Sequence, residues 1–296
     1  MTLGPALILA LVGVLWLDGV LDRTQITGWL STLFGGRATL PPGMAILACS
    51  LALSPLASNE LTHILRHNGV PASRRIMWTA SAIGIVVSCT IPETLNATHA
   101  IGLVSTLAVL VLLLSLLYHA RHREAKGAAA AAGGALLSFV YLGLLFGFIL
   151  AIRRHHSEWL VLVLLLITKS CDIGAFFTGI TLGRRKLIPW LSPGKTWEGL
   201  IGGVLLATLL GLLAARYSHL NPLDPPFALW EGALLGAVLA LVGQAGDLIE
   251  SLFKRDAGVK DSSTAIPGFG GLLDVIDSPL LAAPAAFWLL ALFHAT

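Results

Sequence analysis

Long apolar stretches separated by short polar connections run through the whole chain. A helix of roughly 20 mostly apolar residues crosses the hydrocarbon core of a bilayer, which is about 30 Å thick. Nine such stretches end near charged residues, prolines or turn residues, although the second contains Glu60 and His63. They run from Leu3 to Leu21, Gly43 to Ile64, Ile76 to Ile91, Ala100 to Tyr118, Ala128 to Ile152, Trp159 to Ile180, Trp197 to Ala215, Leu229 to Phe253 and Ser278 to His294. The pattern predicts an all-α fold, a polytopic membrane bundle of about nine transmembrane helices.

The polar connections are too short to hold a second domain; examples run from Arg23 to Pro42 and from Tyr217 to Pro226. We therefore expect a single membrane domain over residues 1–296. N-terminal helices occupy residues 1–160 of it, and the motifs that carry chemistry occupy residues 165–278. The first apolar stretch has no Lys or Arg before it, so we expect a retained helix rather than a signal peptide.

Composition supports the membrane assignment and excludes several other classes of protein. Of the 296 residues, 56% are hydrophobic and only 12% are charged, against about 25% in soluble domains. A soluble core of this size cannot bury that much apolar surface. The high hydrophobicity argues against disorder, the net charge of +3 forms no dense basic block for nucleic acid, and three cysteines are too few for a disulfide scaffold.

Lys and Arg fall unevenly on the two sides of a nine-helix topology, and short cytoplasmic loops hold more of them than exported loops do. The richer side carries Arg66, Arg74, Arg75, Arg121, Arg123, Lys126, Arg184, Arg185, Lys186, Lys195, Lys254, Arg255 and Lys260. The poorer side carries Arg23, Arg37, Arg153, Arg154 and Arg216. This asymmetry predicts that the N-terminus and the loops at 184–196 and 254–277 are cytoplasmic, as in a bacterial-type inner membrane.

Polar residues that a lipid-facing helix does not tolerate gather in three regions of the second half. In the first region, Lys169 and Asp172 lie three positions apart on one helix face and can neutralise each other. Ionisable residues inside a span indicate a functional site, although a structural buried pair would explain them as well.

The second region, from Gly183 to Gly199, is predicted to be a short cytoplasmic loop that opens a new helix. Its cations are Arg184, Arg185, Lys186 and Lys195. Backbone N–H groups near Thr196 would point outward at the helix N-terminus, so the loop suits a polyphosphate. A topology signal with lipid-headgroup contacts is the plainer alternative.

The third region, from Gln244 to Ser278, combines carboxylates, cations and glycines. Four of its residues recur at helical spacing and share one face: Asp247, Glu250, Ser251 and Lys254. A glycine-rich turn with Gly270 and Gly271 can approach a ligand closely. Asp274 and Asp277 follow it, at a spacing that aims both carboxylates the same way if that turn is helical. Alternatively, Ser278-Pro279 resembles an N-cap and first helical residue, which would place the two aspartates just before the last helix. Such carboxylates beside cations suit a hard metal ion with phosphates held by Lys and Arg.

Together these motifs resemble the phosphatidate cytidylyltransferase family, also called CDP-diacylglycerol synthases. The resemblance extends from about Leu165 to Asp277. It rests on Cys171-Asp-Ile-Gly-Ala-Phe176, Leu191-Ser-Pro-Gly-Lys-Thr-Trp-Glu-Gly199, Ser251-Leu-Phe-Lys-Arg-Asp256, Lys260-Asp261, Pro267-Gly-x-Gly-Gly271 and Asp274-x-x-Asp277. Two positions depart from the usual pattern, because Phe269 stands where the family has His and Val275 where it has Arg.

The resemblance implies an enzyme that joins CTP and phosphatidate into CDP-diacylglycerol and pyrophosphate, with Mg²⁺ and, by some accounts, K⁺. It implies metal binding by Asp247, Asp274 and Asp277. Stabilisation of pyrophosphate would fall to Lys254, Arg255 and Lys260, with Asp261 linked to the metal. The remaining expected substrate contacts are Asp172, Lys195, Thr196, Glu198, Ser251, Gly270 and Gly271. We expect no nucleic acid partner, and a homodimer is compatible with the sequence.

Two alternatives use the same residues differently. A CTP-dependent lipid or polyprenol kinase would transfer the γ-phosphate of CTP to a hydroxyl group. An ion-coupled transporter would use Lys169, Asp172 and Asp247 to carry ions or protons, although the chain has no repeated halves with broken helices.

Overall fold

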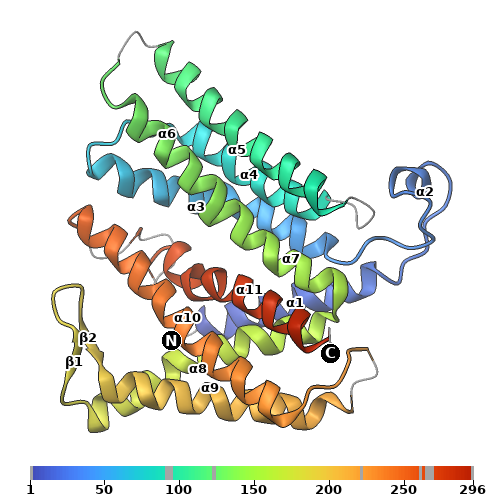
Figure 1. Ribbon diagram of the computed structural model, residues 1–296, viewed down its shortest axis with the longest axis vertical. Coiled ribbons are helices and arrows are strands. Elements are labelled where there is room, and N and C mark those ends of the chain that lie inside the picture. The colour runs from blue at the N-terminus through green and yellow to red at the C-terminus, as the bar shows by residue number, and fades with distance from the viewer. Residues whose placement is uncertain are drawn as a thin grey trace. The chain divides into compact units, whose positions relative to one another are not determined.

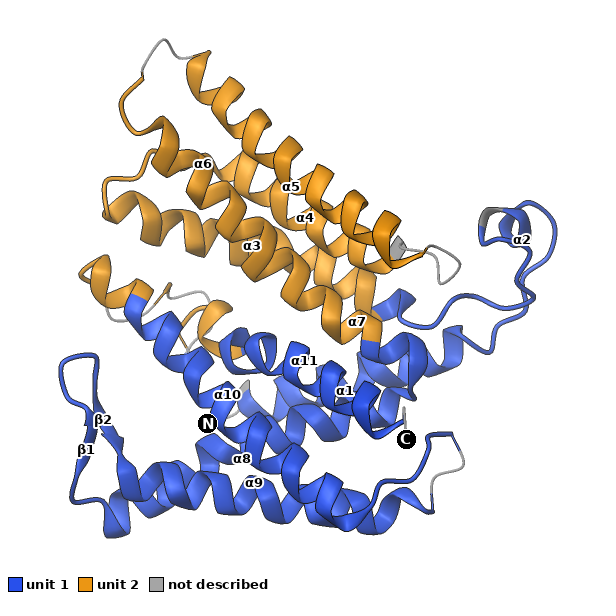
Figure 2. Cartoon of the chain, in the orientation of Figure 1, with its two compact units in different colours: residues 1–45, 152–252, 276–296 blue, residues 46–151, 253–275 orange. Residues whose placement is uncertain are grey.

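Two compact units make up the computed structural model, which describes residues 3–90, 96–121, 125–220, 223–259, 262–263 and 270–294. Unit 1 contains residues 1–45, 152–252 and 276–296, and unit 2 contains residues 46–151 and 253–275 (Figure 2). Each unit is therefore assembled from segments that are far apart in the sequence.

Most of the described chain is helical (Figure 1). The elements are α1 (Leu3–Leu21), α2 (Trp29–Leu33), α3 (Met44–His67), α4 (Arg74–Thr90), α5 (Ala97–Ala120), α6 (Ala128–Leu137), the π-helix η1 (Ser138–Leu144), α7 (Leu145–His155), α8 (Glu158–Leu182), β1 (Lys186–Ile188), β2 (Ser192–Thr196), α9 (Trp197–Ser218), α10 (Leu229–Asp256) and α11 (Leu273–Phe293).

Among the described residues, eight helical segments are long and apolar enough to cross a bilayer, counting Ala128–His155 as one. This confirms the predicted polytopic helical membrane protein. The ninth candidate, predicted from Ile76 to Ile91, forms the 17-residue α4, and Ile91 lies outside the described residues. At 1.5 Å per residue α4 is about 25 Å long, somewhat shorter than the hydrocarbon core.

Close helix packing in unit 2 depends on small residues. The core of Ala80, Val111, Ala135 and Phe139 joins α4, α5, α6 and η1. A Cβ atom on Gly84 would lie 2.7 Å from the Cα atom of Gly143. Glycine at both positions lets α4 approach η1 closely, because a larger side chain would separate the two helices.

In unit 1, α8 and α9 pack side by side (Figure 1). A Cβ atom on Gly174 of α8 would lie 2.9 Å from the carbonyl oxygen of Gly202 on α9. The N-terminal α1 is held to this unit by buried Asp18, which accepts hydrogen bonds from Gly43 N at 3.0 Å and from Arg153 Nε at 2.7 Å. The helices that carry the polar motifs are thus packed tightly.

Two local predictions were wrong. The region expected to be a loop between residues 183 and 199 contains an antiparallel hairpin of β1 and β2, with Lys186 opposite Thr196. The last helix begins at Leu273 rather than at Ser278, so that Pro279 lies inside it. Its early start is stabilised by the Glu60 carboxylate, which accepts hydrogen bonds from the backbone N–H groups of Leu272 and Leu273.

Candidate functional site

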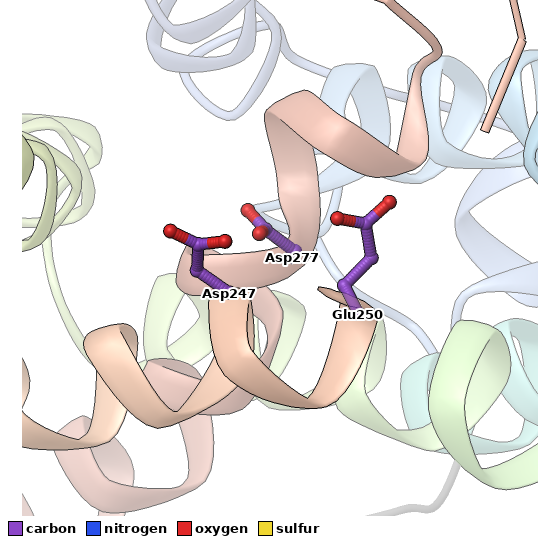
Figure 3. A group of neighbouring side chains, drawn as sticks. All are labelled: Asp247, Glu250 and Asp277. Atoms are coloured by element: carbon purple, nitrogen blue, oxygen red, sulfur yellow. The ribbon is translucent and has the colours of Figure 1, made fainter. Parts of the chain in front are cut away.

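Three carboxylates come together where α10 and α11 pack in unit 1 (Figure 3). Asp247 and Glu250 rise from α10, Asp277 comes from α11, and one oxygen of each lies within 4.8 Å of the others. Glu250 is 1% exposed and Asp277 is 3% exposed, whereas Asp247 is partly open. The three side chains form a cluster of oxygen ligands, which we call the acidic group.

Local sequence explains why these side chains meet. The spacing of three residues places Asp247 and Glu250 on the same face of α10. Gly246 lets α11 approach, because a Cβ atom there would lie 2.7 Å from the carbonyl oxygen of Asp277. Ser278 then fixes the Asp277 carboxylate by donating from its backbone N–H at 2.6 Å and its hydroxyl at 3.1 Å.

Two lysines border the acidic group. Lys195 Nζ lies 2.7 Å from Asp247 Oδ2, and Lys169 Nζ lies 3.7 Å from Asp277 Oδ1. Lys169 also lies 3.4 Å from Asp172 Oδ2, its predicted partner on α8. Four acidic side chains therefore face two lysines, which leaves an excess of carboxylate oxygens. Such a donor set fits a hard divalent cation better than a soft one, because it offers oxygen and no sulfur or imidazole.

The hairpin between α8 and α9 presents Lys195. The helix N-terminus expected near Thr196 is present. Thr196 is the N-cap of α9, and its hydroxyl oxygen accepts a hydrogen bond from Gly199 N at 3.1 Å. The Glu198 carboxylate accepts from the backbone N–H groups of Arg184 and Arg185 at 3.1 and 3.2 Å. Thr196 and Glu198 thus hold the base of the hairpin, and their predicted contacts with a nucleotide stay predictions.

A second polar cluster lies in unit 2, around Asp274. Lys254 Nζ lies 2.5 Å from Asp274 Oδ1, and Asp274 Oδ2 accepts from Gly271 N at 2.7 Å and from the Ser262 hydroxyl at 2.7 Å. Both Asp274 oxygens are therefore engaged within unit 2. The three carboxylates of the acidic group in unit 1 come together without Asp274. The role of Asp274 as a metal ligand stays a prediction.

The glycine-rich turn has an internal reason for its glycines. Gly270 has a φ of 88°, a left-handed conformation that favours glycine. A Cβ atom on Gly271 would lie 2.5 Å from Glu60 Oε2 and would also collide with the Ser262 hydroxyl. The sequence suggested that a ligand approaches these glycines closely. At Gly271 the group that lies close is instead the buried carboxylate of Glu60.

The remaining predicted site residues are more dispersed. The Ser251 hydroxyl donates to Asp247 Oδ1 at 3.4 Å, which places it beside the acidic group. Arg255 is exposed, and its guanidinium donates to the Val259 carbonyl at 3.4 Å. Three residues lie outside the described part of the chain: Lys260, Asp261 and Phe269, the residue that differs from the usual family motif.

Two acidic residues were absent from the predicted site although the sequence contained a signal for each. Glu250 follows Asp247 at the helical spacing that places both on one face. Glu60 is a carboxylate inside an apolar stretch, a position that requires partners. Neither signal identifies those partners, which in the case of Glu60 are more than 200 residues away along the chain.

Comparison with known proteins matches residues 21–293 to the model of the cytidylyltransferase family. The phosphatidate cytidylyltransferase of Staphylococcus saprophyticus is 30% identical over 247 residues, covering 83% of this chain and 89% of the relative. Those of Haemophilus influenzae and Bacillus subtilis are 42% and 39% identical over 130 and 159 residues. These two alignments span about half of the relatives, 45% and 57% of their lengths.

Proposed function

We propose, from the premise that this chain belongs to the cytidylyltransferase family, that it is a phosphatidate cytidylyltransferase. A phosphate oxygen of phosphatidate attacks the α-phosphorus of CTP, and a new P–O bond forms. The bond from the α-phosphorus to the oxygen that bridges to the β-phosphate breaks. Pyrophosphate leaves, and CDP-diacylglycerol stays in the membrane.

The observation that carries this proposal is the acidic group with its two lysines. Both reactants are polyanions, so their mutual repulsion has to be offset before they can meet in line. Carboxylates alone would repel them further, and lysines alone would not select a metal–nucleotide complex. Asp247, Glu250 and Asp277 beside Lys169 and Lys195 provide both functions in one place.

We assign the binding of Mg²⁺ to Asp247, Glu250 and Asp277 of unit 1, with K⁺ as a second ion. Asp274, whose oxygens are engaged within unit 2, is a further metal ligand only in so far as the resemblance implies it. When bound, the metal neutralises phosphate charge and orients the reacting oxygens. Lys195 exchanges part of its interaction with Asp247 for a nucleotide phosphate, and Lys169 holds Asp277 and Asp172 in place. The phosphatidate phosphate is largely ionised near pH 7, so the reaction needs no strong general base.

The departing pyrophosphate requires cations that are not already neutralised by the acidic group. We assign this role to Lys254, Arg255 and Lys260, with Asp261 linked to the metal. Lys254 Nζ lies 2.5 Å from Asp274 Oδ1, a contact that orients its ammonium group. These cations would also compensate for Val275, which replaces the arginine usual in the family.

The proposed orientation has the N-terminus, the β1–β2 hairpin and the loop after α10 in the cytoplasm. The excess of Lys and Arg on that side supports it, as does the need of the enzyme for cytoplasmic CTP. Phosphatidate would enter from the membrane between helices, and the nucleotide would enter from the water.

Replacement of one carboxylate tests the metal assignment. Purified wild-type protein with Mg²⁺, CTP and phosphatidate should release pyrophosphate. Asp277→Asn should lower the rate by about 100-fold or more, because the amide cannot supply the charge of a buried ligand. The readout is pyrophosphate release together with the thermal unfolding midpoint.

Asp224→Asn is the matched control, since Asp224 is a buried aspartate in the connection between α9 and α10. The folded Asp224→Asn variant should release pyrophosphate at the wild-type rate at pH 7. Full activity of a folded Asp277→Asn variant would contradict the metal assignment.

A further inference from the structure

Glu60 is a buried carboxylate of the N-terminal half that interacts with the residues at the start of α11. It lies on α3 and is 6% exposed, and the partners described below all belong to unit 2 (orange in Figure 2). Oε1 accepts from Leu272 N at 2.9 Å and from the Ser263 hydroxyl at 2.6 Å. Oε2 accepts from Leu273 N at 2.9 Å.

These bonds make Glu60 the cap of α11. The first N–H groups of a helix have no partner within the helix, and negative charge is favourable at that end. Most caps come from a residue adjacent in sequence, whereas this one comes from another helix more than 200 residues away. The cap therefore fixes the helix end against α3 in addition to satisfying its donors.

The same contacts include the turn that holds Asp274. Ser262 Oγ lies 2.7 Å from Asp274 Oδ2 and 3.3 Å from Glu60 Oε2, so the hydroxyl contacts both acids. Because a hydroxyl has a single proton, it donates to the nearer acid, Asp274. Gly271 is confined between Glu60 and Ser262. Glu60, Ser262 and Asp274 thus form one connected hydrogen-bonded arrangement that also includes Lys254.

We propose that Glu60 is a positioning residue for catalysis, which sets the first turn of α11 and thereby the Asp274–Lys254 pair. This inference rests on the proposed cytidylyltransferase function, since it assigns Glu60 a part in that site. Glu60 itself touches neither substrate nor metal in this assignment. It acts through the backbone of Leu272 and Leu273 and through the turn that precedes them.

Glu60→Gln is the informative variant because it keeps the size of the side chain. An amide has one oxygen and one NH₂ group, so in either orientation the NH₂ faces a backbone N–H donor. We expect kcat to fall by about 10- to 100-fold, the range for a misplacement of roughly 1 Å, while KM for CTP changes by less than about threefold.

Two further variants separate positioning from stability. Glu231→Gln is the matched control, because Glu231 is a buried glutamate that accepts from Ala228 N at 2.6 Å at the start of α10. Its amide oxygen can keep the bond from Ala228 N, so the variant should lower the unfolding midpoint less than Glu60→Gln does and leave kcat within about threefold. Ser263→Ala removes a neutral donor and leaves both backbone bonds of Glu60, so its effect on kcat should be small.

Hydrogen exchange gives a readout that does not depend on activity. Peptides covering residues 270–278 should exchange hydrogen faster in Glu60→Gln than in wild type. In Glu231→Gln the same peptides should exchange at the wild-type rate. Unchanged exchange, or a kcat that falls no more than in Glu231→Gln, would overturn the inference. Failure of wild-type protein to form CDP-diacylglycerol would instead contradict the proposed function, and the exchange result would still report on the cap.

Discussion

Individual carboxylates in this protein have different roles that their sequence context only partly reveals. Asp247 and Glu250 were readily placed on one helix face, because helical spacing is a local property. Their proximity to Asp277 depends on Gly246, because a glycine has no side chain and the α11 backbone can pack closely against it. Asp274 lies one turn before Asp277, yet its oxygens are engaged by Lys254, Ser262 and Gly271. Residue type and spacing identified Asp247 and Asp277 as site residues, whereas packing adds Glu250 and determines the partners of all three.

Asp224 gives a prediction about pH. Burial raises its pKa, but hydrogen bonds from His156 and Ser157 outweigh this and hold the pKa below the usual 3.8. The Ser157 N–H donates at 2.7 Å. A folded pKa below the unfolded one stabilises the protein above the unfolded pKa, and that stabilisation is lost as the pH falls through the folded pKa.

We therefore expect Asp224→Asn to lower the unfolding midpoint at pH 7 by about 2–6 °C, the effect of losing roughly 1–2 kcal/mol of buried hydrogen bonding. The difference from wild type should shrink as the pH falls from 5 towards 3. Thermal unfolding in detergent across this range is the measurement. A difference that stays constant from pH 7 to pH 3 would show that the Asp224 charge contributes nothing.

At the level of elements, the helices were predictable and their ends were less so. Apolar length identifies a span because the bilayer requires it, so the long helices agree with the predicted stretches. The beginning of α11 could not be predicted, since Ser278-Pro279 is a good local start and the true cap comes from Glu60. The β1–β2 hairpin was missed because it is short and contains Pro193 and Gly194, residues that usually indicate loops.

The contact between α8 and α9 gives a prediction at this scale. Gly174→Leu introduces a side chain where a Cβ atom already lies 2.9 Å from the Gly202 carbonyl and 3.0 Å from the Leu206 Cβ atom. Overpacking of this kind costs about 1–3 kcal/mol, so the unfolding midpoint should fall by several degrees. The helices cannot separate without moving Lys169, so activity should fall as well.

Gly102→Leu is the matched control, because Gly102 is exposed on α5 and a Cβ atom there would meet nothing within 4 Å. It should leave the midpoint unchanged or slightly higher, since leucine favours helix more than glycine does. Equal losses in both variants would mean that the α8–α9 contact is not specific.

For the whole molecule, each of the two units combines segments from distant parts of the chain. The sequence motifs lie between about residues 165 and 277, and by themselves they leave the N-terminal half as a membrane anchor. Glu60 shows a more direct role for that half, because α3 supplies the carboxylate that caps α11. Such a contact between distant segments has no local pattern, which is why the chemistry of the site was more predictable than the residues that support it.

At this scale the function itself is tested by whether the membrane protein transfers the cytidylyl group of CTP to phosphatidate. The most direct measurement supplies purified protein in phosphatidate-containing micelles with Mg²⁺ and CTP labelled at either the α- or the γ-phosphate. We predict that α-label enters the lipid fraction and that γ-label appears only in released pyrophosphate. Lipid that carries γ-label and no α-label would identify a kinase and contradict cytidylyl transfer.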